Sequence, residues 1–228
     1  MHLASILNFA RVAGASALLV SAAHAQLSLT GYLTGSFTDT AGTYDTIFNA
    51  PDGSQAWIRS GVPETGADFQ TAIEFTRKDF ANVTGGLVAD DLFRVTNGRT
   101  LLGTTATSAH FDLWLHLTAP DAHSSLLTPI SFAIENTPNG TGNVNDVYGI
   151  TASPIAPFHY AGHRVQFEFV APAAFEIPEN SWTDVGQLYV TFTPVPEPST
   201  YAAVGAALLV GVIALRRIRQ RPANVLRA

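Results

Sequence analysis

The sequence predicts an all-β protein: an antiparallel β-sandwich or jelly-roll-like body, flanked by an N-terminal signal peptide and a single C-terminal transmembrane helix. Three observations lead to this prediction. Short apolar–polar alternations recur between residues 72 and 192, each bounded by Gly, Pro, Asn or Asp. No amphipathic helical pattern of useful length interrupts them. Apolar runs stand near both ends of the chain, over 12–23 and 201–215.

The N-terminal segment has the order of a secretory signal peptide. Positive charge at Arg11 precedes an apolar stretch, and Ala23 and Ala25 place small residues at the two positions that a signal peptidase reads. The predicted cleavage falls before Gln26, so residues 1–25 are the predicted signal peptide. The apolar stretch is too short for a spanning helix. An uncleaved N-terminal anchor is the alternative interpretation.

The body, residues 26–193, carries most of the acidic side chains. Its six basic and 17 acidic residues give it a net charge of −11, whereas the whole chain has a net charge of −6. Such an acidic surface repels phosphate backbones, so no nucleic-acid partner is expected. The absence of cysteine excludes disulfides, thiolate nucleophiles and cysteine metal sites. The length suits one domain with a core of its own.

Five segments of the body show the period-two alternation of half-buried strands. The clearest runs from Phe111 to Leu117. Asn97-Gly98, between two apolar segments, predicts a tight hairpin turn. The stretch 38–54 is rich in turn-forming residues and predicts a loop. The five predicted strand segments are 72–76, 111–117, 130–135, 165–169 and 187–192.

Residues 194–200 form a proline-rich linker that contains the motif Val195, Pro196, Glu197 and Pro198. Proline fixes φ, removes a backbone donor and pushes the preceding residue towards extended geometry. Alternating prolines therefore predict a stiff extended segment that cannot join the interior of a sheet. We expect the motif to stay accessible to a processing enzyme.

The linker leads into the apolar run 201–215, which is predicted to be a transmembrane helix. At about 1.5 Å per residue, its 15 residues give about 22 Å of helix, less than the hydrocarbon thickness of about 30 Å. The following basic residues predict a cytoplasmic tail over 216–228, with the body outside. A buried core helix with a basic end is the alternative. The predicted membrane stop consists of Arg216, Arg217, Arg219 and Arg221.

The order of this C-terminal region resembles the PEP-CTERM sorting signal of Gram-negative and related bacteria. Val195, Pro196, Glu197 and Pro198 match the motif residue by residue, and the resemblance covers about 194–221. It implies handling by an exosortase, an integral membrane cysteine transpeptidase-like enzyme, at the inner membrane. It also implies export through that membrane, temporary anchoring with the body outside, and delivery to the cell surface or extracellular space of exopolysaccharide-producing bacteria.

The order of segments in the body is similar to that of the bacterial choice-of-anchor domains, most closely type K, over about 53–192. This resemblance implies a β-sandwich with an exchangeable C-terminal anchor, and it implies no catalytic activity. The segments that carry it are 92–98, 111–117, and 134–139 leading to Asn145 and Asp146.

An oxygen-rich loop over 136–146 is a candidate for calcium binding. Ca²⁺ takes six to eight oxygen ligands, and this loop offers only one carboxylate without EF-hand spacing. A turn cluster built from asparagine and glycine explains the same residues. No cofactor is expected apart from this candidate ion. The candidate ligands are Asn139, Asn143, Asn145 and Asp146.

Trp114 is the candidate sugar platform. It shares the polar face of its strand with Asp112 and His116, so partial exposure is expected. Ordinary packing under a loop or against a second sheet is the alternative. His110 and His116 on the same strand stand about 20 Å apart, too far to share a metal ion, which favours a solvated face.

The sequence thus predicts an exported surface or matrix protein without catalytic activity, with a structural or adhesive role. A carbohydrate-binding module on the same anchor, with exopolysaccharide as its partner, is the alternative. A hydrolase comes third, because the chain lacks the serine-hydrolase, zinc-protease and P-loop patterns. The 17 acidic residues of the body are nevertheless compatible with a pair of catalytic carboxylates such as glycosidases use.

Overall fold

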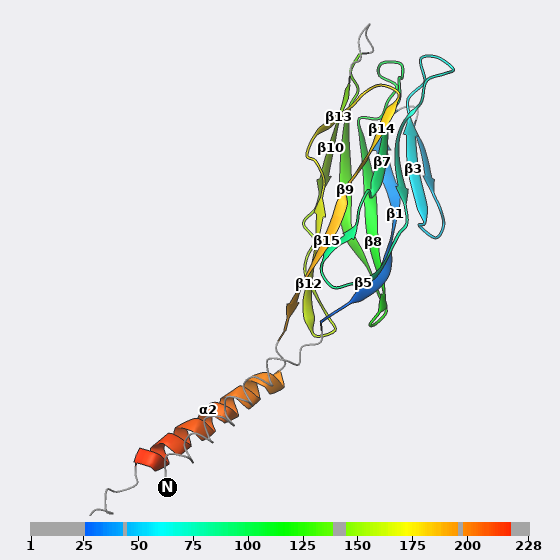
Figure 1. Cartoon of the computed structure of the whole chain (residues 1–228). Helices are drawn as coiled ribbons and strands as arrows, with labels where there is room; N and C mark the ends of the chain where they lie inside the picture. Colours follow the sequence, from blue (N-terminus) through cyan, green and yellow to red (C-terminus); the bar gives the residue numbers. More distant parts are fainter. Residues whose placement is uncertain (1–25, 43–44, 139–144, 196–197, 220–228) are drawn as a thin grey trace, which may run out of the picture. The chain divides into compact units, whose positions relative to one another are not determined.

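The computed structural model describes residues 26–42, 45–138, 145–195 and 198–219 (Figure 1). Residues 27–193 form one compact unit, and the segment from Pro194 onwards belongs to a second. The body is mostly antiparallel β-structure, as the sequence predicts, and its strands form three sheets. The predicted signal peptide lies outside the described residues.

The largest sheet contains six strands and forms one layer of the body. Every neighbouring pair in it is antiparallel. Its strands, in spatial order, are β13 (Phe175–Ile177), β10 (Asp146–Ala152), β9 (His123–Glu135), β8 (Ser108–Ala119), β1 (Leu29–Ala41) and β5 (Lys78–Val83).

Two smaller sheets supply the remaining strands. The five-stranded sheet has the order β14 (Ser181–Val185), β7 (Phe93–Asn97), β4 (Thr71–Thr76), β3 (Gln55–Ser60) and β2 (Thr46–Asn49). The four-stranded sheet has the order β11 (Phe158–Tyr160), β12 (His163–Val170), β15 (Gln187–Pro194) and β6 (Gly86–Ala89).

Side-chain alternation decides which face of each strand is buried. In β8 the odd-numbered residues from Ala109 to Leu117 are buried, while the even-numbered ones face outwards. The same period of two runs through β4 and β7, where Ile73, Phe75 and Phe93 are fully buried. All five predicted strand segments lie within strands of the structure, which confirms this part of the prediction.

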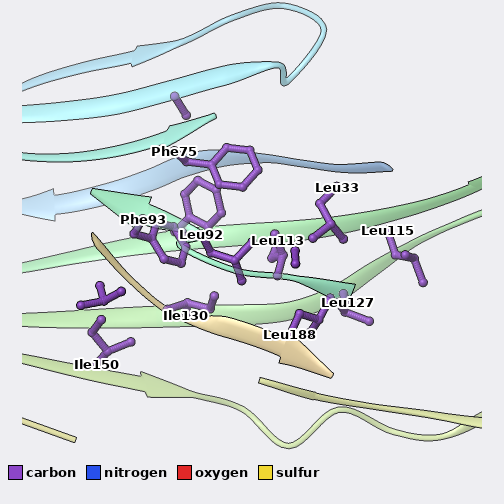
Figure 2. Close-up of a cluster of buried hydrophobic side chains, with 14 of the residues drawn as sticks. Leu33, Phe75, Leu92, Phe93, Leu113, Leu115, Leu127, Ile130, Ile150 and Leu188 are labelled. Carbon is purple, nitrogen blue, oxygen red and sulfur yellow. The ribbon is translucent and has the colours of Figure 1, made fainter. Parts of the chain in front are cut away.

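The apolar faces of the three sheets meet in one continuous core. Figure 2 shows Phe75 and Phe93 of the five-stranded sheet and Leu188 of the four-stranded sheet beside residues of β8 and β9. Ring contacts tie the layers together: Phe93 approaches Phe111 and Phe132 edge-on, each with ring centroids 5.0 Å apart. This arrangement fits a β-sandwich.

Asn97-Gly98 does not form the predicted hairpin turn. β7 ends at Asn97 and pairs with β4 and β14, and residues 99–102 form no strand. The Asn97 side chain is fully buried and donates from Nδ2 to the backbone oxygen of Ile177 at 2.8 Å. Gly98 is not in the left-handed region, and a Cβ built on it would overlap the backbone of Phe69. The pair serves close packing rather than chain reversal.

The stretch 38–54, predicted to be a loop, is partly strand. β1 continues to Ala41, and Thr46–Asn49 forms β2. Asn49 makes this possible, because its side chain accepts a hydrogen bond from Phe37 N at 2.8 Å and donates one to Phe37 O at 2.9 Å. These bonds hold β2 beside the bulged part of β1, whose own ladder is interrupted there.

The C-terminal unit contains helix α2 (Pro198–Arg219). The helix begins at Pro198 because the fixed φ of proline suits the first helical position, where no backbone donor is needed. Within the described part of the chain, no helix combines the length and the hydropathy that a membrane span requires. The transmembrane helix predicted over 201–215 is therefore not found, in keeping with the short reach of that apolar run.

Candidate functional site

Trp114 lies on the outer face of the six-stranded sheet, with 38% of its surface exposed. It sits opposite Thr34 of β1 in the antiparallel ladder. The neighbouring outward residues of β8, Asp112 and His116, are partly exposed on the same face. The structure therefore places these three side chains on one outer surface.

The three tryptophans differ in what covers their rings. The Arg59 guanidinium lies 4.7 Å from the Trp57 ring, which also stacks on Phe48. The Arg94 guanidinium lies 4.1 Å from the Trp182 ring. Trp114 has neither a cation nor another ring against it within the described part of the chain. Trp182 is more exposed overall, at 54%, but Trp114 is the tryptophan of the described residues whose ring is not covered by a cation or another ring.

A shallow hollow of about 290 Å³ opens beside Trp114. The hydroxyl-bearing Thr34 and Ser36 line its floor, and Asp52 lies in the turn that bounds it. Hydrogen bonds from Ser54 hold the pKa of the Asp52 carboxyl below its usual value, so this group is ionised at neutral pH. The hollow combines an apolar ring with polar groups, which is the composition of a small-ligand site.

The turn 50–53 is fixed against β1 by its backbone. Gly35 N donates to Gly53 O at 3.2 Å, and Gly53 has a φ of +66°. A Cβ on Gly53 would lie 2.9 Å from the Cβ of Thr34, so glycine permits both the turn and the close approach. The turn 50–53, which forms one wall of the hollow, is therefore held in a fixed position against β1.

Tyr32 and His116 form a stacked pair next to this hollow, with ring centroids 4.7 Å apart and an interplanar angle of 17°. His116 is hydrogen-bonded to Thr34 and Ser124, each at 2.8 Å. Burial, and to a smaller extent Arg77, lowers the pKa of His116, so the ring is neutral at neutral pH. The imidazole is a fixed, uncharged part of the surface.

A second hollow, of about 390 Å³, lies on the other side of Tyr32. The guanidinium of Arg77 covers the Tyr32 ring at 3.7 Å and pairs with Asp79 at 2.6 Å. Thr30 and Thr118 add hydroxyl groups to its lining. No sequence pattern indicates that Asp52, Arg77 and Ser36 gather around Trp114 and Tyr32, because these residues come from separate segments that only the sheet brings together.

The candidate calcium loop is only partly described. Asn139 and Asn143 lie outside the described residues. Asp146 is almost fully buried, and its Oδ1 accepts hydrogen bonds from Thr137 N at 2.8 Å and Thr137 Oγ1 at 2.9 Å. Asn145 donates to Glu176 at 3.1 Å. No cluster of three or more metal-ligating His, Cys, Asp or Glu side chains occurs within the described ranges. Thr137 thus supplies two donors to Asp146 Oδ1.

Asp146→Asn is expected to stabilise the body at neutral pH. Burial raises the pKa of the Asp146 carboxyl in the folded state. At pH values above the unfolded-state pKa, the native state therefore binds more protons at Asp146 than the unfolded state does. As a result, the unfolding free energy falls as pH rises through the folded-state pKa. An asparagine Oδ1 accepts the same two hydrogen bonds without a charge. Thermal unfolding of both proteins between acidic and neutral pH measures the effect.

The matched control for this prediction is Asp146→Ala, which removes the acceptor. It should be less stable than Asp146→Asn by about 1 kcal/mol at every pH, since neither variant titrates at this position. An asparagine variant that is less stable than the wild type at neutral pH would contradict the prediction.

Three carboxylates meet at the outer face of the five-stranded sheet. Glu74, Asp91 and Asp184 line an open hollow of about 200 Å³ together with Arg94 and Lys78. Arg94 binds Asp184 through two hydrogen bonds of 3.0 and 3.3 Å, which keeps this carboxylate occupied. This is the arrangement of an ion-pair network on a sheet surface.

The sorting segment begins where the last strand ends. β15 finishes at Pro194, and Val195 follows outside regular structure with 37% of its surface exposed. Pro196 and Glu197 lie outside the described residues, and Pro198 is the first residue of α2. At the other predicted processing point, Gln26 is exposed, whereas Ala23 and Ala25 are outside the described part of the chain.

The predicted stop residues cluster at the end of α2. Arg216 is exposed in its last turns, and Arg217 and Arg219 also belong to the helix. Arg221 lies beyond the described residues. Cationic side chains are favoured at this end of a helix because the macrodipole is negative there.

Comparison with known families identifies the C-terminal segment. Residues 194–219 match the family described as the PEP-CTERM protein-sorting motif. No curated protein matches the chain significantly. The matched residues begin at the last residue of β15 and end at the last residue of α2. The motif supports a protein that is sorted to the cell surface through an exosortase, with processing at the membrane.

Proposed function

We propose that the chain is an exported, non-enzymatic protein of the cell surface or extracellular matrix, with a structural or adhesive role in an exopolysaccharide-associated layer. A signal peptide over 1–25 starts its export. The C-terminal segment holds it at the inner membrane for a time, with the β-sandwich outside. An exosortase then processes it at the Pro-Glu-Pro motif.

The observation that carries this proposal is the PEP-CTERM match at residues 194–219. It follows directly on a body that is a compact unit of its own, residues 27–193. Removal of the C-terminal segment would thus leave the core intact, because every residue of the core cluster lies between Leu27 and Val190. A removable sorting segment attached to a domain with its own core is what we expect of a protein that is exposed at the cell surface after processing.

Glu197→Ala is expected to block processing, so that the precursor accumulates in the membrane fraction. Glu197 is the charged residue between the prolines of the motif. Intact-mass spectrometry of the protein from its native host should show a mature wild-type species without the arginine-rich tail and a variant that retains it. Glu168→Ala, at an exposed glutamate of β12, is the matched control and should be processed normally. A mature wild-type species that still ends at Ala228 would contradict the proposal.

Carbohydrate binding by the displayed body is the second candidate function. The observation that favours it is the uncovered ring of Trp114 beside a hollow with hydroxyl and carboxylate groups. An exposed ring stacks on the apolar face of a sugar, while the polar groups around it bind hydroxyls. Such a site would attach the exported body to polysaccharide.

A further inference from the structure

We propose that the two hollows on either side of the Tyr32–His116 pair form one extended site for a polysaccharide chain without negative charge. This inference rests on the proposed carbohydrate-binding function and adds the length and the charge class of the ligand. It is carried by the alignment of the hollows, by the rings between them and by the unpaired carboxylates of this face.

Residues of β1 and β8 line both hollows. One lies over Thr34 and Ser36 of β1, and the other over Thr30 and Tyr32. The six-residue step from Thr30 to Ser36 corresponds to about 20 Å of extended strand. The surface is therefore long enough for several linked sugar rings, and both hollows are shallow enough to admit a chain from the side.

Ring-bearing side chains occur at two points along the surface formed by β1 and β8. Trp114 offers its ring in the first hollow. The Tyr32–His116 stack separates the two hollows, and hydrogen bonds between His116 and the hydroxyl groups of Thr34 and Ser124 fix its position. Because rings and hydrogen bonds hold the surface in place, little ordering is needed when a chain binds.

The charge of this face selects against anionic chains. Asp52 and Asp112 form no ion pair within the described residues, and the one arginine of the hollows, Arg77, is paired with Asp79. The body as a whole has a net charge of −11. A uronate or sulfate chain would bring further negative charge to ionised Asp52, which like-charge repulsion disfavours. Neutral sugars can instead donate hydroxyl hydrogens to this carboxylate.

Affinity electrophoresis of the full chain tests the charge class with two matched pairs of polymers. Hydroxyethyl cellulose and carboxymethyl cellulose share one backbone, and dextran and dextran sulfate share another. We expect retardation by at least one neutral polymer, with affinity at least about tenfold higher than for its charged counterpart. Equal or stronger binding of the charged member would overturn the inference while leaving carbohydrate binding in place. Retardation by none of the four polymers would overturn both.

Three variants tie the binding to this face. Trp114→Ala should weaken binding of the neutral polymer by about tenfold or more, since it removes the free ring. Trp182→Ala is the matched control, because Trp182 is 54% exposed on a different sheet, and it should leave affinity unchanged. Asp52→Asn should raise affinity for the charged polymer. Equal losses in Trp114→Ala and Trp182→Ala would contradict the assignment of the site.

A fourth variant tests the extent of the site. Arg77 lines the second hollow and not the first, so Arg77→Ala removes a contact surface from the second hollow. It should weaken binding of the long neutral polymer and leave binding of its disaccharide unit unchanged, whereas Trp114→Ala should weaken both. If Arg77→Ala has no effect on the polymer, the site ends at Tyr32 and the extended site is refuted. Thermal unfolding of each variant shows whether the fold is retained.

Discussion

Replacing Phe111 by alanine is expected to lower the free energy of unfolding by about 3–5 kcal/mol. The ring is fully buried, and its centroid lies 4.9 to 5.0 Å from those of Phe37, Phe75 and Phe93. These contacts join β8 and β1 of one layer to β4 and β7 of the other. The cavity left by the missing ring would lie between sheets that their hydrogen-bond ladders prevent from closing. Domains of this size have stabilities of about 5–15 kcal/mol, so the loss is a large part of the total.

Chemical denaturation of the purified protein measures this effect. Phe69→Ala is the matched control, because the Phe69 side chain is 52% exposed and its replacement should change stability by about 0.5 kcal/mol or less. If the two variants lost similar amounts of stability, the ring cluster between the layers would not be the main contact of the core.

Gly98→Ala is expected to lower the free energy of unfolding. Overpacking costs about 1–3 kcal/mol, and we expect a value in the upper part of that range. A Cβ at this position would overlap Phe69 O and lie 2.6 Å from Thr71 N. Both are backbone atoms next to the start of β4, so they cannot move aside as the end of a flexible side chain can. Gly98 and Thr71 also exchange two hydrogen bonds that hold this approach in place.

The matched control is Gly66→Ala. A methyl group at Gly66 would meet no heavy atom within 4 Å, and Gly66 does not have a positive φ, so alanine is accommodated there. Urea titration of both variants should give a clear loss for Gly98→Ala and little change for Gly66→Ala. A stable Gly98→Ala protein would show that this close approach is not required.

The difference between the expected and observed roles of Asn97-Gly98 shows where local sequence reasoning fails. The dipeptide favours a two-residue hairpin in isolation. In the structure the Asn97 side chain bonds to Ile177, which is 80 residues away, and Gly98 packs on residues 69–71. Those long-range contacts outweigh the local preference of the pair, and no short window of sequence contains them.

The candidate ligand surface was predictable in part. Alternation in the 111–117 strand places Trp114, Asp112 and His116 on one outer face, because consecutive side chains of a strand point in opposite directions. The partners of Trp114 were not predictable. Thr34 reaches it through the register of β1 with β8, and Asp52 through the turn that Gly53 holds against β1.

The β-rich body, its acidic charge and the C-terminal sorting motif can all be derived from the amino-acid sequence, since period-two alternation, composition and a contiguous motif are local properties of the chain. Which strands are neighbours, where β2 lies and which rings remain uncovered become known from the three-dimensional fold. The physical reason is that strand pairing and sheet packing join residues far apart in the chain. Trp57, Trp114 and Trp182 have the same side chain. Their different partners come from the three-dimensional arrangement alone.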